Sequence, residues 1–166
     1  MKYFFLILMF TALFNTAHGQ EIKFIKDYNS INSTSELFNQ LKGKTIFLDL
    51  WATWCDPCKE EFKHSDTLYR ELKKRNIALL YLSLNTRVVE SDWKADIAQY
   101  HLKGFHALAN HELENSVTTM IWGAPGGFSI PRYLLIRRDG KILLSDALSP
   151  DHGAQLYRQI DSALRK

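Results

Sequence analysis

The stretch FLDLWATWCDPCKEEF, residues 47–62, decides how this chain is expected to fold. It opens with an apolar run that contains one carboxylate, Asp49, and it holds both cysteines of the 166 residues, Cys55 and Cys58. A disulfide between cysteines so close together closes a very short loop, and by the chain-entropy argument it restrains little of the unfolded chain. We therefore predict that the pair reacts with other thiols and disulfides rather than serving as a structural staple.

Two apolar runs of strand length flank a helical pattern in this part of the chain. Residues 45–51 and 77–84 are short apolar segments that predict buried central strands. Between them, residues 56–75 place apolar side chains at roughly helical spacing with charges on the other face, which predicts an amphipathic helix. The order strand, helix, strand predicts a parallel pair with a crossover connection.

Two more helical patterns follow the second strand. Residues 91–102 and 110–122 have the composition of helices, with Ser91 and Asn110 as their expected N-caps. We predict two helices here, before the chain returns to the sheet.

The last part of the chain predicts a hairpin and a final helix. A glycine-rich break at 123–127 leads into residues 128–147, where the turn signal at 138–141 separates two apolar runs and predicts an antiparallel hairpin. Residues 150–164 predict an amphipathic helix. Together these elements predict one α/β domain with a central mixed sheet flanked by helices.

The chemistry of the cysteines depends on where the first helix begins. If it begins just after Cys55, the helix dipole favours the thiolate of that residue over the usual thiol pKa of about 8.5. Cys58, one turn further in and deeper, can then attack a mixed disulfide formed at Cys55. Pro57 suits the first turn because it has no N–H to leave unpaired.

Asp49 and two tryptophans surround this motif. A carboxylate on a central strand loses its hydration, so its pKa rises and it can exchange a proton near neutral pH, although an Asp at an exposed strand edge fits the same pattern. Trp51 and Trp54 lie on the approach to the thiols, just before Cys55. We expect core packing for Trp51 and an apolar platform for an incoming substrate at Trp54.

The first residues predict a leader. Lys2 precedes an apolar run at 3–14 and a small-residue end at 17–19, which is the pattern of a secretory signal. We predict cleavage after Gly19, leaving a single domain over residues 20–166, with an uncleaved anchor as the alternative.

The charge balance excludes an obvious polyanionic partner. Without Lys2, 20 basic residues face 18 acidic ones, a net charge of +2, so we predict no nucleic-acid partner. The short basic clusters at 73–75 and 137–138 are expected to be solvated surface.

A resemblance to a known family now adds to this reading. The segment WATWCDPC with the preceding FLDL resembles the active-site signature of thioredoxin-fold proteins. With the leader, the extra helical stretch and SIPRYLLIRRDGKI, the chain is similar to the exported TlpA/ResA-like thiol–disulfide oxidoreductases. The resemblance implies a thioredoxin fold with a helical insertion before the strand that follows a cis-proline.

The same resemblance assigns roles around the groove. It implies that Cys55 is the attacking thiol, Cys58 the resolving thiol, and Pro131 the cis-proline that faces the disulfide. From sequence alone a cis bond is the minority outcome for Ile130-Pro131. A cis-proline there would leave the backbone of Ile130 free to pair with a substrate strand. With Trp54 and Pro57, these two residues form the predicted substrate-binding set.

Two acids complete the predicted site. Asp49 matches the buried aspartate that serves the inner cysteine in thioredoxins. Glu61 matches an active-site glutamate of ResA-type proteins, with a plain solvated role as the alternative. The predicted catalytic set is therefore Cys55, Cys58, Asp49 and Glu61.

Asp56 bears on the direction of electron flow. Its charge opposes a forming thiolate at Cys55, which makes the reduced form less stable and the couple more reducing. We therefore predict a disulfide reductase with no cofactor beyond the Cys55–Cys58 disulfide. The resemblance implies a periplasmic or other extracytoplasmic location, a membrane thiol electron donor, and exported protein substrates with disulfides, such as apocytochrome c. We expect a monomer.

Three other functions compete with this one. A copper or zinc carrier would use both cysteines and one histidine, a thiol peroxidase would need a Thr-x-x-Cys context that the chain lacks, and a non-catalytic binding module would keep only the fold. We predict no metal site, because the histidines lack metal-ligand spacing and each is expected to be a surface or satisfied core residue. The histidines considered as a third ligand are His64, His101, His106, His111 and His152.

Overall fold

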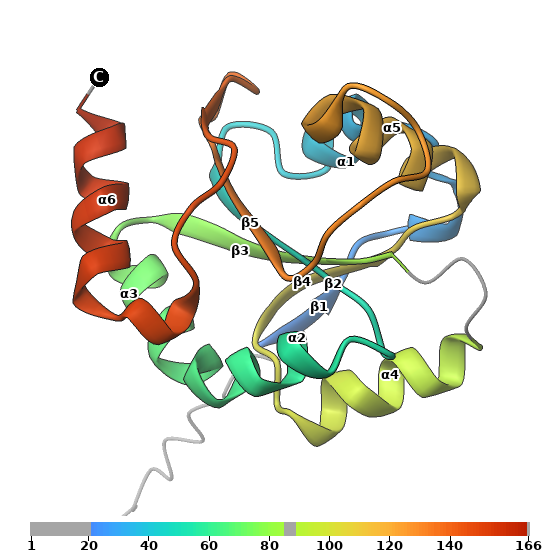
Figure 1. The fold of residues 1–166 in the computed structure, drawn as a ribbon, viewed down its shortest axis with the longest axis horizontal. Helices are drawn as coiled ribbons and strands as arrows, with labels where there is room; N and C mark the ends of the chain where they lie inside the picture. Colours follow the sequence, from blue (N-terminus) through green and yellow to red (C-terminus); the bar gives the residue numbers. More distant parts are fainter. Residues whose placement is uncertain (1–20, 85–88, 166) are drawn as a thin grey trace, which may run out of the picture.

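The computed structural model describes residues 21–84 and 89–165, so the predicted leader at 1–19 lies outside the described residues. Its centre is a six-stranded mixed sheet in the order β1-β4-β3-β2-β5-β6 (Figure 1). The strands are β1 Ile22–Phe24, β2 Thr45–Trp51, β3 Ile77–Ser83, β4 Gly104–Leu108, β5 Arg132–Ile136 and β6 Ile142–Leu144.

Helices cover both faces of this sheet (Figure 1). The helices are α1 Thr34–Asn39, α2 Asp56–Glu61, α3 Ser65–Lys74, α4 Glu90–Gln99, α5 His111–Trp122 and α6 Ala154–Leu164. Short 3₁₀ turns lie at η1 Tyr28–Ser30, η2 Phe62–His64 and η3 Pro150–His152. In the described segments, none of the helices is long and apolar enough to cross a bilayer.

The two central strands form the predicted parallel pair. β2 and β3 run in register from the pair Thr45 and Ile77 to the pair Trp51 and Ser83. Apart from Asp49 and the polar residues at their ends, both strands are apolar throughout, as is typical of strands that helices cover on both faces. β2 also pairs antiparallel with β5, and β5 and β6 form the predicted hairpin. The expected thioredoxin-type α/β architecture is confirmed.

Alternate side chains of β2 enter two separate apolar layers. Phe47 and Trp51 point into the layer that α2, α3, α4 and α6 cover. Leu48 and Leu50 point into the opposite layer, under α1 and α5. Asp49 has the same parity as Phe47, so it enters the layer below the helix that carries the cysteines.

The predicted helix over 56–75 is wrong in one respect, because η2 divides it into α2 and α3. Phe62 opens this turn and packs edge-on against Trp51 and Tyr81, with ring centroids at 5.2 and 6.2 Å. The apolar pattern continues unbroken through the turn, so periodicity alone gave no signal of it.

The predicted helical insertion also contains a strand. β4 lies between α4 and α5 and joins β3 to β1, and neither β1 nor β4 was predicted. Both are short, and β4 begins at a glycine and holds a histidine at its centre. The insertion therefore widens the sheet as well as covering it, with α4 on one face and α5 on the other.

Three helix ends test the predicted caps. Asn110 caps α5 as predicted, with Oδ1 accepting from the N–H of Leu113 at 2.8 Å. The cap of α4 is Val89 rather than Ser91. The final helix begins at Ala154, after Gly153 with a φ of +48°, rather than at residue 150.

Arg75 departs from the predicted solvated cluster. Its guanidinium bonds Asp161 of α6 with two nitrogens, at 2.8 and 3.1 Å, and bonds Glu71 at 2.8 Å. It also lies over the ring of Tyr157 at 5.2 Å. This residue therefore joins α3 to α6, whereas Lys73 and Lys74 are exposed as expected.

Candidate functional site

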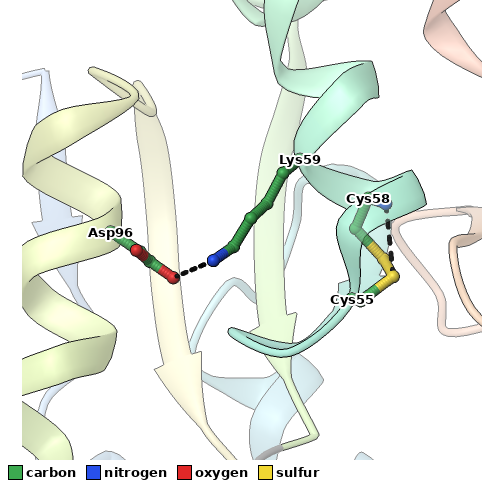
Figure 2. Close-up of a disulfide and its surroundings, with 4 residues drawn as sticks. All are labelled: Cys55, Cys58, Lys59 and Asp96. Carbon is green, nitrogen blue, oxygen red and sulfur yellow. Dashed lines mark hydrogen bonds and ion pairs between the residues drawn. A yellow bond between two sulfur atoms is a disulfide. The ribbon is translucent and has the colours of Figure 1, made fainter.

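The two cysteines form a disulfide where β2 passes into α2 (Figure 2). The S–S distance is 2.05 Å, and Cys55 is the N-cap of α2, as the sequence predicted. The N–H of Cys58 donates to Sγ of Cys55 at 3.2 Å. Pro57 lies exposed in the first turn. A donor aimed at Cys55 favours the thiolate of that residue once the disulfide is reduced.

Lys59 anchors this helix to the insertion. Figure 2 shows its side chain pointing from α2 toward Asp96 of α4, and the ion pair is 3.2 Å long. Both side chains are largely buried, at 24% and 16% exposure. The insertion therefore supports the helix that carries the cysteines.

Trp54, the residue before Cys55, is exposed and has an aromatic neighbour. Trp54 is 59% exposed, and its ring lies 6.1 Å from that of Phe128. Trp51 is fully buried in the core, as expected. Phe128 was not predicted as a site residue. A signal was present, because it lies three residues before Pro131 and directly before the segment SIPRYLLIRRDGKI that carried the family resemblance.

The predicted cis-proline is confirmed at Ile130-Pro131. The pairing of β2 with β5 ends at Leu50 and Arg132, so Pro131 lies beside the end of β2, where the cysteine motif begins. Pro131 also lines a shallow depression of about 340 Å³ with Glu61 and Tyr133. The structure thus brings the proline loop and the end of α2 to the same surface.

Asp49 is buried behind the disulfide helix, with only 2% exposure. Its Oδ1 has no hydrogen-bond partner in the described part of the chain. Burial raises the pKa of Asp49 well above its usual value, and the charge of Glu61 raises it further. The predicted burial is confirmed, and the role in proton transfer stays a prediction.

Glu61 lies half-buried at the end of α2. Its Oε2 accepts from the N–H of Asp151 at 3.1 Å. Burial raises the pKa of Glu61, while this hydrogen bond acts in the opposite direction. The side chain is therefore held near the buried acid and still reaches solvent.

Two tyrosines near Asp49 were missed by sequence reasoning. Tyr81 and Tyr133 are the register partners of Asp49 on the two neighbouring strands. Their parity in the two predicted strands could have placed them on the Asp49 face, once the register was known.

Over residues 21–84 and 89–165, no group of three or more His, Cys, Asp or Glu side chains could hold a metal ion. His106 is buried, with Nε2 at 2.9 Å from the carbonyl oxygen of Leu102, and its Nδ1 has no partner in these segments. It is therefore a core residue with only one of its two ring nitrogens hydrogen-bonded in the described segments.

Comparison with known proteins identifies relatives of the whole arrangement. Residues 18–145 match the profile of the AhpC/TSA family. A thiol-disulfide oxidoreductase ResA from Bacillus cereus is 30% identical over 126 residues. That match covers 76% of this chain and 65% of the relative, which is slightly less than two thirds of its length.

Solved structures of similar fold include other thiol–disulfide exchange proteins. The solution structure of a candidate thiol-disulfide oxidoreductase from Bacteroides vulgatus is 26% identical, with a TM-score of 0.59, over 75% of this chain and 78% of that one. A crystal structure described as a candidate thiol:disulfide interchange protein DsbE from Chlorobium tepidum is 26% identical, with a TM-score of 0.58, over 76% and 84% of the two chains. The predicted fold and the predicted resemblance are both confirmed.

Proposed function

The chain belongs to the AhpC/TSA family, and on that premise we propose that it is a thiol–disulfide oxidoreductase that reduces protein disulfides outside the cytoplasm. The observation that carries the proposal is the Cys55–Cys58 disulfide at the start of α2, with Asp49 buried in the strand that leads to it. The names of the relatives support the same chemistry.

The first step uses Cys55. Its thiolate attacks one sulfur of a substrate disulfide, so that a bond forms between Cys55 and the substrate while the substrate S–S bond breaks. The departing substrate sulfur takes up a proton. Trp54 and Phe128 offer the apolar surface on which the substrate chain lies, and the loop at Pro131 faces it.

The second step uses Cys58 and Asp49. The Cys58 thiol gives its proton to Asp49, and the resulting thiolate attacks Sγ of Cys55. The disulfide of the protein forms, the bond to the substrate breaks, and the second substrate sulfur leaves and is protonated. Two electrons have then passed from the protein dithiol to the substrate.

The direction, location and partners are part of the proposal. Asp56 lies exposed between the two cysteines, where its charge disfavours the thiolate and makes the couple more reducing. The apolar N-terminal stretch supports export. An exported reductase must be recharged, so a membrane thiol donor is proposed, with oxidised exported proteins such as apocytochrome c as clients.

Reduction of insulin by dithiothreitol tests the activity. We expect the protein to accelerate precipitation of the insulin chains, and expect Cys55→Ser to abolish the acceleration, because the attacking sulfur is lost. Cys58→Ser should trap the mixed disulfide. The proposed function is contradicted if the protein leaves the rate of insulin precipitation unchanged although its own disulfide is shown to be reduced by dithiothreitol.

A redox titration tests the direction separately. We expect a potential well below the value of about −120 mV that is typical of strong oxidants. A value near that of the oxidants would reverse the assignment from reductase to oxidase without affecting the chemistry of the two cysteines.

A further inference from the structure

A row of polar and aromatic side chains crosses the sheet beneath the cysteine helix. Five residues are neighbours in register, on five successive strands, and share the face that α2 covers. In order from β1 to β5 they are Phe24, His106, Tyr81, Asp49 and Tyr133. Cross-strand neighbours have Cβ atoms about 5 Å apart. The carboxyl group of Asp49 therefore lies between two phenols.

Both phenols have the same unusual feature. The hydroxyl groups of Tyr81 and Tyr133 are buried and have no hydrogen-bond partner in the described part of the chain, and the same holds for Oδ1 of Asp49. With Nδ1 of His106, four polar groups of this row have no partner in the described residues. This is unexpected, since buried polar atoms are almost always paired. A phenol donates readily to an ionised carboxylate, so the row is suited to hold Asp49 in its charged form.

The surroundings of the two phenols differ. The ring of Tyr81 stacks on that of His106, with centroids at 5.1 Å and an interplanar angle of 5°, and Phe62 closes its other side. Tyr81 and His106 are both fully buried. Tyr133 stacks on Phe47 at 5.9 Å. It also lines the surface depression with Glu61.

We propose that Tyr133 is a positioning residue through which Asp49 exchanges its proton with Glu61 and the solvent, an inference that rests on the proposed function. Tyr133 is a register partner of Asp49, which is almost fully buried, and it lines the surface depression together with Glu61, which reaches solvent. Tyr81 is also a register partner of Asp49, but it does not line the depression that Glu61 lines, and it takes no part in the proton exchange.

The proton balance is simple. When Cys58 has given its proton to Asp49, the carboxylic acid passes a proton across one water molecule to the oxygen of Tyr133. The Tyr133 hydroxyl gives up its own proton to the carboxylate of Glu61, which releases it to solvent. The phenol ends neutral, and Asp49 is again an ionised base.

The charges that face Asp49 come from several elements. On the core side they come from β3 and α3, and on the outer side from α2, β5 and the turns η2 and η3. Electrostatic interactions join Asp49 to Glu61 and to both tyrosines, and join Glu61 to charged groups of its own. The titratable groups around Asp49, Glu61 and the two tyrosines are Tyr81, Tyr133, Cys58, Glu61, Asp66, Asp151, His64 and His152.

The test isolates the second chemical step. Fully reduced protein is mixed with a chromogenic aromatic disulfide, which releases one coloured thiol when Cys55 attacks and a second when Cys58 resolves the mixed disulfide. The rate of the second, concentration-independent phase is measured from about pH 5 to about pH 9. We expect this rate to rise with pH as Asp49 loses its proton. This rising limb of the pH profile should be absent in Asp49→Asn.

Tyr133→Phe is the decisive variant, and Tyr81→Phe is its matched control. We expect Tyr133 to donate a hydrogen bond to Asp49 once that carboxyl group is ionised. Without this donor, the rising limb of Tyr133→Phe should move up by about one pH unit, so that at a pH on the limb the phase slows about tenfold. Tyr81→Phe should leave the limb in place. Both variants keep their ring packing, and circular dichroism checks their folding.

Three results overturn the inference: an unshifted limb in Tyr133→Phe, an equal shift in Tyr81→Phe, or a limb that survives in Asp49→Asn. If Tyr133→Phe does not fold, carbon-13 labelling of the tyrosine Cζ atoms in the unmodified protein replaces it. The Tyr133 signal should then titrate with the midpoint of the limb, and a signal that does not contradicts the role. Absence of the first coloured phase would instead contradict the proposed function.

Discussion

At the scale of single residues, the buried His106 should make the folded protein less stable in acid. Its ring is fully buried between Tyr81 and Phe24. Burial lowers the pKa of His106 to about 4, from a usual value of 6.5. Below about pH 6.5 the unfolded chain therefore binds a proton that the folded protein does not bind, so stability falls as the pH falls.

The expected size of this effect is about 3 kcal/mol between pH 6.5 and pH 4, because each unit of pKa is worth about 1.4 kcal/mol. His106→Gln keeps a donor toward the carbonyl of Leu102 but cannot ionise, so its free energy of unfolding should fall less over this range. Urea unfolding at several pH values measures the difference. His64→Gln, at an exposed position, is the control, and an equal effect there would contradict the assignment.

At the scale of elements, the docking of β4 on β3 depends on Gly104. Its φ is +139°, and a Cβ atom there would lie 2.7 Å from the backbone oxygen of Leu79. A side chain would therefore force the two strands apart. The strand that the sequence failed to reveal begins at the one residue type that permits this approach.

Gly104→Ala should lower the free energy of unfolding by more than about 2 kcal/mol, since backbone strain and a backbone clash add together. Gly140→Ala is the control, because its φ is +86° and nothing lies within 4 Å of the added atom. The control should lose only about 1 kcal/mol, from strain alone. Equal losses, measured by urea unfolding of the oxidised protein, would show that the contact with Leu79 is unimportant.

The elements also show what sequence could and could not predict. β2 and β3 were predictable because both faces are buried and the whole run is apolar. The site around Cys55 and Cys58 was predictable because a helix start follows directly from the local sequence. β4 was not, because its pairing with β3 and β1 depends on segments far apart in the chain.

At the scale of the whole molecule, Arg75 joins two helices that are distant in sequence. It connects α3 to Asp161 of α6, 86 residues further along the chain, and its side chain is only 22% exposed. Such a two-nitrogen pair, stacked on an aromatic ring, depends on the shape of the guanidinium as well as on its charge.

Arg75→Lys should therefore lower the free energy of unfolding by about 1 kcal/mol, although the charge is kept. The neighbouring Lys74→Gln removes an exposed pair with Glu71, in which the lysine is 69% exposed, and should change stability by less than about 0.5 kcal/mol. Urea unfolding compares the two. A loss for Arg75→Lys no larger than that for Lys74→Gln would mean that the link between the helices contributes nothing beyond charge.

At this scale, the contacts between distant segments of the chain could not be predicted from the sequence. The parity of Asp49 was readable from the sequence, but its phenolic neighbours became known only with the register of β2 against β3 and β5. The family resemblance supplied the cis bond at Pro131, which local sequence disfavours.

The hairpin of β5 and β6 turns at the far end of the sheet from the sulfurs. Its tip, residues 138–140, is exposed and follows Ile136, which pairs with Ile46 near the start of β2, whereas the disulfide follows the last residue of β2. A protein tethered to a bead or electrode through this tip would present its redox couple outward to the solution. Immobilised in that orientation, it could retrieve its own clients from an extract as covalent adducts.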